Sequence, residues 1–424
     1  MSHTIPSQRL PFHYGWLIVT SGALVLFACF GLARYAYAML LPGMQTGLGL
    51  PYDRLGLIGT ANFSGYLVSV LLAPRVLRHL RPRPLIGCGL LLIGLALLGI
   101  AGSTAFWQVA LFYTLAGLGG GFANIPLMLL VTYWFHRARR GTALGLVLSG
   151  NGAGIVLSGL LIPFLNRLYG VQGWRAGWLV LGGCCLAVAG AAALLLRNSP
   201  AELGLEPIGQ PDVCSPEQFV SHEGRQSGLI LVLLGLVYLA FGATFMIYGT
   251  FIVTSMVREY GLSEGLAGRY WSWVGICSMF SGIIFGGLSD RIGRKGGLAL
   301  VLLVQTVAYL LVGLKLGGPW LVLSIVLYGL AVFAIPTIMT AAIADYLGLA
   351  RAASAFATVT LFFAAGQVAG PGLAGMLARA SGSFSYAYLV SACLTLLACV
   401  AALALPHCGS GRAVAGKAEQ QTGH

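Results

Sequence analysis

The chain has 424 residues, of which 58% are hydrophobic and only 8% are charged, and its formal net charge is +13. A soluble chain would be about one quarter charged, whereas apolar runs such as 85–102 and 174–196 are long enough to cross a bilayer. The composition therefore excludes a soluble enzyme and predicts an all-α integral membrane protein. The positive charge does not indicate a nucleic-acid partner, because Lys and Arg lie in short loops between the apolar runs.

In chain order, the apolar runs predict twelve membrane helices in two sets of six, with a polar break after the sixth. The first set is expected at residues 15–42, 55–79, 84–103, 106–132, 142–168 and 174–196. The second set is expected at residues 228–257, 265–289, 297–316, 319–344, 352–379 and 384–405. The predicted organisation is an N-terminal six-helix bundle (1–196), a linker (197–227), a C-terminal six-helix bundle (228–405) and a tail (406–424).

The distribution of positive charge predicts how the chain crosses the membrane. With the N-terminus in the cytoplasm, 16 of the 24 Lys and Arg residues fall in inner segments. The positive-inside rule then places both termini in the cytoplasm. We expect a multi-pass protein of the plasma (inner) membrane.

The two sets of helices resemble each other in sequence. FGLARYAYAML (30–40) has a counterpart in FGATFMIYGTF (241–251), and FANIP (122–126) has one in FAIP (333–336). Two parallel six-helix repeats commonly hold a substrate site between them, near the middle of the bilayer. The repeat therefore predicts two parallel six-helix bundles with such a site.

Arg34 stands in the middle of the first apolar run, FACFGLARYAYAMLLP (27–42). An Arg in hydrocarbon costs ~2.5–3.5 kcal/mol on insertion scales and usually faces a cavity or a partner. No acidic residue of the first six helices is expected at membrane depth, and the guanidinium fork suits a carboxylate ligand. The alternative is that Arg34 lies near the membrane surface and extends its charge toward the headgroups.

Other polar and aromatic residues at the expected membrane depth complete the candidate substrate site. Tyr37 and Trp273 could instead belong to an interfacial aromatic belt, and each of the others could instead make a helix–helix hydrogen bond. Asn124 and Thr337 flank Pro126 and Pro336, where we expect the fourth and tenth helices to be interrupted. The candidates besides Arg34 are Tyr37, Asn62, Tyr66, Asn124, Asn151, Tyr248, Trp273, Thr337 and Gln367.

The segment GGLSDRIGRKGGL (286–298) joins the eighth and ninth expected helices. Topology alone explains its basic residues but not Asp290, a carboxylate at a helix end that can pair with Arg or a neighbouring helix N-terminus. The segment resembles the G-x-x-x-D-R-x-G-R-K loop of the major facilitator superfamily, which implies that fold and a conformational latch. The implied latch residues are Gly286, Asp290, Arg291, Gly293 and Arg294. The matching loop of the first half, LLAPRVLRHLRPR, has Ala-Pro where the Asp belongs.

A second segment, YWFHRARRGTALGLVLSGNGAG (133–154), resembles the fifth-helix signature of monocarboxylate transporters, and YGW (14–16) is similar to the start of that branch. GWRAGW (173–178) and SPAELGLEPIG (199–209) recur there and in the oxalate:formate antiporters. Mammalian members carry a helix-1 Lys at the position of Arg34, which implies that Arg34 meets a substrate carboxylate. The branch's Asp-x-x-x-Arg pair in helix 8 and the antiporters' cations in helices 8 and 11 are missing, which favours a monoanion over a dianion.

These patterns predict a secondary transporter, not an enzyme, that moves a small organic anion, most simply a monocarboxylate, by alternating access. The first alternative is an efflux transporter for drugs or amphiphiles, which usually carries an intramembrane acid. The second alternative is a non-transporting membrane sensor or scaffold. No pattern for a phosphate loop, cofactor or metal is present. The expected partners are the anion and the lipid bilayer, with the protein a monomer.

Titratable residues are expected only in loops, tails and helix ends. The chain has seven histidines, all outside the predicted helix interiors, and no Asp or Glu is expected at mid-membrane depth. Arg stays charged throughout the working pH range. The sequence therefore predicts anion exchange, or a symport in which the proton's path depends on the substrate carboxylate.

Overall fold

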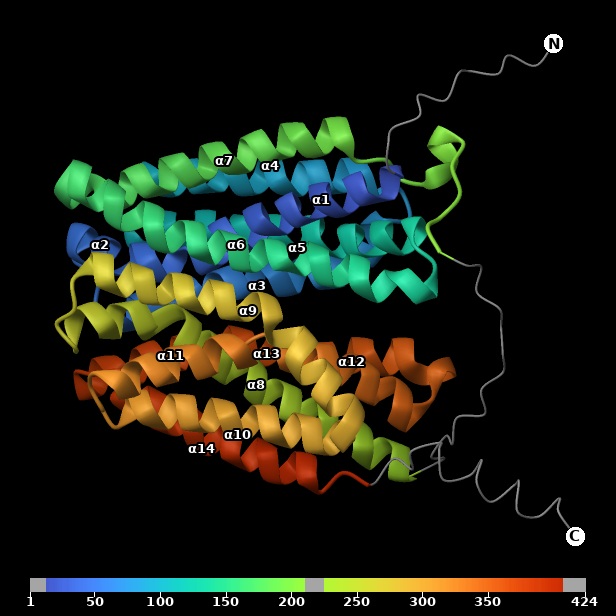
Figure 1. Cartoon of the computed structure of the whole chain (residues 1–424). Helices are drawn as coiled ribbons and strands as arrows, with labels where there is room; N and C mark the ends of the chain where they lie inside the picture. The colour runs from blue at the N-terminus through green and yellow to red at the C-terminus, as the bar shows by residue number, and fades with distance from the viewer. Residues whose placement is uncertain (1–12, 210–224, 407–424) are drawn as a thin grey trace, which may run out of the picture. The chain divides into compact units, whose positions relative to one another are not determined.

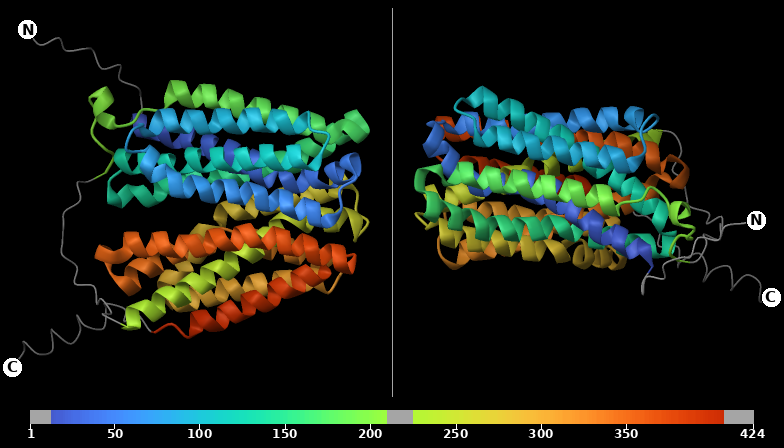
Figure 2. Two further views of the ribbon diagram at one scale, coloured as in Figure 1. Left: turned by 180° about the vertical axis from the view of Figure 1, so that it is seen from behind. Right: turned by 90° about the horizontal axis from the view of Figure 1, so that it is seen from above.

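The computed structural model describes residues 13–209 and 225–406, and long helices are its dominant elements (Figures 1 and 2). Residues 1–12, 210–224 of the expected linker and 407–424 of the expected tail lie outside this described part. Within it, eleven stretches are long and apolar enough to cross a membrane. The predicted fifth and sixth spans count as one of the eleven, because a short 3-10 helix joins them into a continuous helical stretch.

The chain divides into two compact units. The first comprises residues 1–50, 61–215 and 264–275, and the second comprises 51–60, 216–263 and 276–424. The helices lying wholly in the first unit are α1 (Tyr14–Leu26), η1 (Phe27–Tyr35), α2 (Tyr37–Leu48), α4 (Pro82–Ala101), α5 (Phe106–Trp134), α6 (Arg137–Tyr169), η2 (Gly170–Gln172), α7 (Gly173–Leu195) and η3 (Pro200–Leu203). Those lying wholly in the second are α8 (Arg225–Arg258), α10 (Arg294–Gly313), α11 (Pro319–Ala331), α12 (Ala334–Leu347), α13 (Leu349–Ser381) and α14 (Ser385–Leu403).

Two helices, α3 (Tyr52–Val76) and α9 (Glu264–Ile292), contribute to both units. The first turns of α3 pack with the second unit, where the Thr60 hydroxyl donates to the Val368 carbonyl at 2.7 Å. The first turns of α9 pack with the first unit, where the Ser272 hydroxyl donates to the Val156 carbonyl at 3.2 Å. Each unit therefore includes the first turns of a helix whose remaining residues belong to the other unit.

The first span consists of three helical segments rather than the single helix expected at 15–42. After α1 come the nine π-helical residues of η1, and then α2. In η1 the backbone bonds reach one residue further than in an α-helix, and the Ala36 N–H donates to the Gly31 carbonyl at 3.2 Å. Gly31 lies so close to α6 that a Cβ on it would be 2.6 Å from the Gly154 Cα. Because π-helical turns occur frequently at functional sites, the position of Arg34 in η1 singles out this segment.

The two membrane prolines expected to interrupt helices behave differently. The tenth span is broken into α11 and α12 around Phe333. Pro336 explains the break, because proline lacks a backbone N–H and its ring clashes with the carbonyl four residues earlier. The Phe333 N–H donates to the Ser281 hydroxyl at 3.2 Å instead. By contrast, α5 continues unbroken through Pro126, so the predicted interruption of the fourth span is wrong.

The matching segments of the two repeats make similar contacts. Arg34 and Phe245 occupy the same place in FGLARYAYAML and FGATFMIYGTF. The Tyr113 hydroxyl of α5 donates to the Arg34 carbonyl at 3.3 Å, and the Tyr328 hydroxyl of α11 donates to the Phe245 carbonyl at 2.8 Å. A tyrosine from the fourth or tenth span thus holds the backbone of the first or seventh span at this position in each unit.

The segment after α7 packs on the first unit and accounts for two sequence motifs. The Tyr14 hydroxyl donates to the Leu195 carbonyl at 2.7 Å, and the Trp134 indole N–H donates to the Arg197 carbonyl at 3.1 Å. The Ile208 N–H donates to the Trp134 carbonyl at 2.9 Å. The YGW and SPAELGLEPIG motifs therefore meet at one end of the first unit, where they connect α1, α5 and α7.

Candidate functional site

Arg34 is surrounded by three aromatic rings of the first unit. Its guanidinium carbon lies 4.5 Å from the centroid of Phe30, 4.9 Å from that of Phe63 and 4.5 Å from that of Tyr66. Phe30 precedes Arg34 by four residues, and the other two rings come from α3. Such contacts stabilise a cation through the negative faces of the rings. They explain how an Arg is tolerated in an apolar span without a carboxylate beside it.

The hydrogen-bonding groups of Arg34 remain available. In the described part of the chain, no protein group accepts a hydrogen bond from its side chain, and no carboxylate forms an ion pair with it. The side chain is half-buried rather than sealed in the protein core. A guanidinium offers five N–H donors in a planar fork, so this cation can bind an anion without first breaking a protein contact.

Two further candidates are linked to Arg34, because Tyr66 contacts it directly and Asn124 contacts Tyr66. The Asn124 side-chain amide of α5 donates to the Tyr66 hydroxyl at 3.3 Å. The Phe30 and Tyr66 rings pack edge to face, with centroids 5.8 Å apart. Tyr66 and Asn124 are half-buried, as Arg34 is. The structure therefore brings three predicted site residues together on helices η1, α3 and α5.

The remaining candidates of the first unit lie deeper or face outward. Tyr37 is 3% exposed and packs against Tyr113 with ring centroids 5.0 Å apart. Asn62 and Asn151 are buried, and the Asn62 amide donates to the Tyr113 carbonyl at 3.0 Å. Trp273 is 46% exposed. Tyr37, Asn62 and Asn151 are therefore packed between helices, whereas Trp273 faces outward.

The three candidates of the second unit make local contacts. Tyr248 is fully buried and its hydroxyl is 2.8 Å from the Ser324 hydroxyl. The Thr337 hydroxyl donates to the Phe333 carbonyl, four residues earlier, at 3.1 Å. Gln367 is 2% exposed, and its side-chain carbonyl has no hydrogen-bond partner among the described residues. Tyr248 and Thr337 thus have structural partners, whereas Gln367 retains an unused acceptor.

The predicted latch loop contains a three-charge cluster. Arg294 donates through Nη1 to Asp290 at 2.5 Å and through Nε to Asp345 of α12 at 2.6 Å. Between the helices, Gly293 has φ 83°, a conformation that favours glycine. Gly286 lies near Thr337, and Arg291 is exposed. The sequence did not identify Asp345, although an acidic residue near the end of the tenth span was an available signal.

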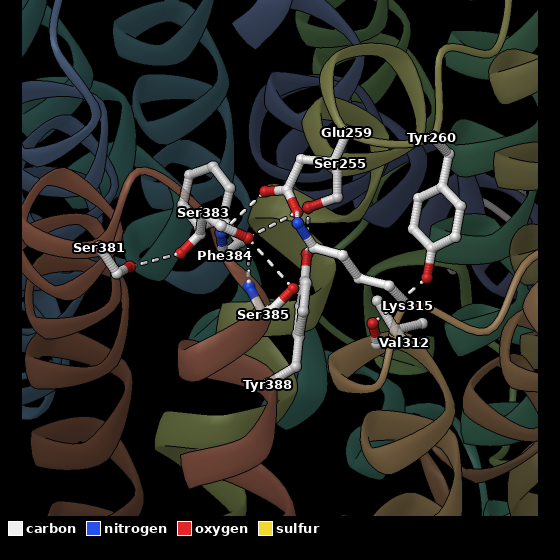
Figure 3. Close-up of polar contacts among 10 residues, drawn as sticks. All are labelled: Ser255, Glu259, Tyr260, Val312, Lys315, Ser381, Ser383, Phe384, Ser385 and Tyr388. Carbon is white, nitrogen blue, oxygen red and sulfur yellow. Dashed lines mark hydrogen bonds and ion pairs between the residues drawn. The ribbon is translucent and has the colours of Figure 1, made fainter.

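A buried carboxylate connects three helices at one end of the second unit (Figure 3). Glu259 accepts hydrogen bonds from the Ser383 hydroxyl and the Phe384 N–H, both at 2.8 Å, and lies 3.4 Å from the Lys315 ammonium. Burial first, and the Glu259 carboxylate second, raise the pKa of Tyr260 to about 12. Tyr260 therefore stays protonated at neutral pH and donates to an α10 carbonyl at 3.2 Å. With both oxygens partnered at the start of α14, Glu259 serves as a helix cap.

Of the three rings around Arg34, sequence reasoning named Tyr66 as a candidate and missed Phe30 and Phe63. Phe30 was detectable, because residues four apart lie on the same helix face. Phe63 approaches from α3, and no local spacing relates it to Arg34. No group of three metal-ligating side chains suited to hold an ion occurs among the described residues.

The chain was compared with known families and curated proteins. The family model described as "Uncharacterised MFS-type transporter YbfB" matches residues 26–403. The chain is 26% identical over 406 residues to monocarboxylate transporter 12 of Rattus norvegicus, covering 89% of this chain and 82% of that protein. It is 28% identical over 176 residues to a probable hexose phosphate transport protein of Chlamydia pneumoniae, covering 41% and 38%. It is also 28% identical over 184 residues to the membrane sensor protein UhpC of Salmonella typhimurium, covering 43% and 41%. The matches thus span about two fifths of the last two relatives.

Solved structures show the same fold at low sequence identity. A bacterial homologue of the human lysosomal transporter Spinster, in an inward-facing and unoccupied conformation, matches with TM-score 0.70 at 16% identity, covering 92% of this chain and 95% of that one. The nucleoside transporter NupG matches with TM-score 0.70 at 14% identity, covering 93% and 99%. The predicted fold class is confirmed. The chain belongs to the YbfB-type transporter family of the major facilitator superfamily, which is not a family of enzymes, and it is a multi-pass integral membrane protein.

Proposed function

We propose that this transporter carries a small organic monoanion, most simply a monocarboxylate, and that Arg34 holds the carboxylate. The observation that carries this proposal is the environment of Arg34, whose charge is stabilised by three rings while no described protein group uses its N–H donors. A carboxylate matches the planar guanidinium fork with two parallel hydrogen bonds. The similarity to a protein named monocarboxylate transporter 12 supports the same substrate class.

The proposed transport cycle is alternating access without a cofactor. While the anion is bound, it pairs with Arg34, so neither charge is isolated in the membrane interior. We also propose a monomer of the plasma (inner) membrane with both termini in the cytoplasm, on the basis of its loop charges. In this orientation the Asp290–Arg294–Asp345 cluster lies at the cytoplasmic side and contributes to the latch.

Two other functions compete with anion transport. A sensor that binds the anion without moving it is favoured by the similarity to the membrane sensor protein UhpC. An efflux transporter for lipophilic cations fits less well, because Arg34 would repel a cation. In the described part of the chain, no carboxylate pairs with Arg34 to offset this repulsion. Uptake into proteoliposomes separates a transporter from a sensor, and competition with a lipophilic cation tests the efflux alternative.

The most economical test measures the melting temperature of the purified protein with matched acids and amides. Acetate, lactate, butyrate and benzoate are each compared with the corresponding primary amide, which keeps the shape and removes the charge. An acid present at 100 times its dissociation constant should stabilise the folded protein by about 2.7 kcal/mol, which raises the melting temperature by several degrees. The amides should have no such effect. Equal shifts with acids and amides, or no shift with any acid, would contradict the proposal.

A further inference from the structure

Tyr66 carries a hydroxyl whose hydrogen has no acceptor among residues 13–209 and 225–406. Its oxygen accepts a hydrogen bond from the Asn124 amide at 3.3 Å, and a phenol that accepts in this way still has one hydrogen to donate. No described residue receives that hydrogen. The Tyr66 ring is also one of the three rings around the Arg34 guanidinium, at 4.5 Å.

We propose that Tyr66 is the second donor to the substrate carboxylate and that Asn124 is the positioning residue that holds its hydroxyl in place. This inference rests on the proposed function, because it assumes that Arg34 binds a carboxylate. It adds a division of roles, in which Arg34 supplies charge, Tyr66 supplies a directed hydrogen bond and Asn124 acts only through Tyr66.

The arrangement around Arg34 favours this second donor. The three rings interact with the cation through their faces and use none of its N–H groups. Because the Tyr66 ring is in contact with the guanidinium, its hydroxyl is within reach of a carboxylate that Arg34 holds. A hydrogen bond to a charged group stabilises a complex more than one to a neutral group. The hydroxyl should therefore discriminate between a carboxylate and an amide.

The surrounding rings also define the class of substrate. Phe30 and Phe63 contact the same guanidinium, so the part of the anion next to its carboxylate lies among aromatic surfaces. A second carboxylate at that place would be buried without a positive partner, which is unfavourable. The site therefore suits a monocarboxylate with an alkyl or aryl body, and benzoate and butyrate should bind more tightly than lactate, whose hydroxyl would have to be desolvated.

The test is a double-mutant cycle on the purified full-length protein. The probe is the acid with the largest melting-temperature shift among acetate, lactate, butyrate and benzoate, and its affinity is measured for the wild type, Tyr66→Phe, Asn124→Ala and the double variant. Tyr66→Phe keeps the ring and removes only the hydroxyl, and it should weaken acid binding roughly tenfold while leaving the amide unaffected. Asn124→Ala should weaken binding about threefold in the wild type and not at all in Tyr66→Phe, because a positioning residue has no effect once its target is gone.

Several outcomes would overturn the inference. If Tyr66→Phe binds the acid as the wild type does while Arg34→Gln has lost binding, the second donor is wrong and the proposed function stands. If Asn124→Ala costs the same factor with and without the Tyr66 hydroxyl, Asn124 is not a positioning residue. If Arg34→Gln also binds normally, the proposed function itself falls. Ser64→Ala, a neighbouring substitution on α3, is the control for general damage to the helix.

Discussion

Arg34 and Phe245 occupy the same place in the two sequence repeats, and they differ in what surrounds them. Phe245 is 3% exposed and stacks on Phe241 and Phe363, with ring centroids 4.6 and 5.8 Å away. Arg34 is half-buried, has rings on its guanidinium and leaves its N–H donors unused by the described protein. A packed aromatic residue at this position is thus compatible with the fold, which does not require a cation there. The proposed binding role accounts for the cation in the other repeat, which packing does not require.

Arg294 gives a second contrast within the same molecule. It is held by two carboxylates, those of Asp290 and Asp345, so its charge is already balanced by the protein. Arg34 has rings in place of carboxylates, which leaves its charge to be balanced by something else. Arg294 is thus paired within the described protein, whereas we propose that Arg34 pairs with a ligand.

The largest effect is expected when the two residues are exchanged. Phe245→Arg places a charge in a buried aromatic stack, at a cost of at least ~2.5–3.5 kcal/mol on insertion scales. Thermal melting and the amount of protein in the membrane should show a severe loss of stability. Arg34→Phe should keep or raise the melting temperature and abolish acid binding. Equal destabilisation by the two substitutions would remove the contrast between the two positions.

Gly31 and Gly242 lie about one helical turn before Arg34 and Phe245, and they allow the two repeats to be compared again. A Cβ on Gly31 would meet the Gly154 backbone, and one on Gly242 would meet the Phe363 carbonyl. Gly31→Ala and Gly242→Ala should each lower stability by about 1–3 kcal/mol, because two helices must separate. Only Gly31→Ala should also weaken acid binding, since it displaces η1 and with it Arg34. Chemical unfolding and affinity measurements on the same samples would check this, and equal affinities in the two variants would argue against the functional role of η1.

A smaller effect is expected at Arg294. Arg294→Gln leaves Asp290 and Asp345 without their cation, but Asp290 is 64% exposed, so solvent weakens the interaction. The free energy of unfolding should fall by about 1 kcal/mol, with acid affinity unchanged. If the cluster is a latch, labelling of a cysteine introduced at exposed Ser354 should also become faster in Asp290→Asn. Unchanged labelling and unchanged flux would reduce Asp290 to a marker of topology.

The smallest effect concerns protons. The described spans carry their Asp, Glu and His residues at or near the helix ends, and Glu259 is fully partnered. A pH gradient should therefore drive uptake of an acid only through the substrate's own carboxyl group. With an amide, a pH-sensitive dye inside proteoliposomes should report no proton movement. Proton movement at a fixed ratio to amide transport would show that a group of the protein itself carries protons, which would contradict this prediction.

The fold was largely predictable from sequence, and the site was predictable only in part. Lengths of apolar runs gave the spans, and the D-R-x-G-R-K loop gave the superfamily, because both are local patterns. The π-helical segment that holds Arg34 was not predictable, since it coincides with a close approach of Gly31 to Gly154, 123 positions further along the chain. Pro126 and Pro336 have the same local signal, yet only the helix at Pro336 is broken. Tertiary packing therefore determines whether the helix is broken at each of these two prolines.

Charge and depth made Arg34 a candidate from the sequence, but they did not indicate which side chains would contact its guanidinium. Asn62 and Asn124 looked equivalent as polar residues in apolar runs. Asn62 donates to the Tyr113 carbonyl, whereas Asn124 donates to the Tyr66 hydroxyl beside Arg34. Which side of a helix faces which neighbour is set by packing between distant segments, and a single sequence does not encode that in any local spacing.

The most direct test of the central claim is uptake of a labelled monocarboxylate by proteoliposomes containing Arg34→Lys, Arg34→Gln or Phe245→Leu, at matched amounts of inserted protein. Arg34→Lys keeps the charge and loses the fork, so it should retain weak uptake. Arg34→Gln should lose the charge-assisted hydrogen bonds, worth roughly 1.5–3 kcal/mol, and its affinity should fall by about one to two decades. Phe245→Leu should transport with wild-type affinity. Near-wild-type uptake by Arg34→Gln would contradict the account, because Arg34 would then have no role in holding the anion.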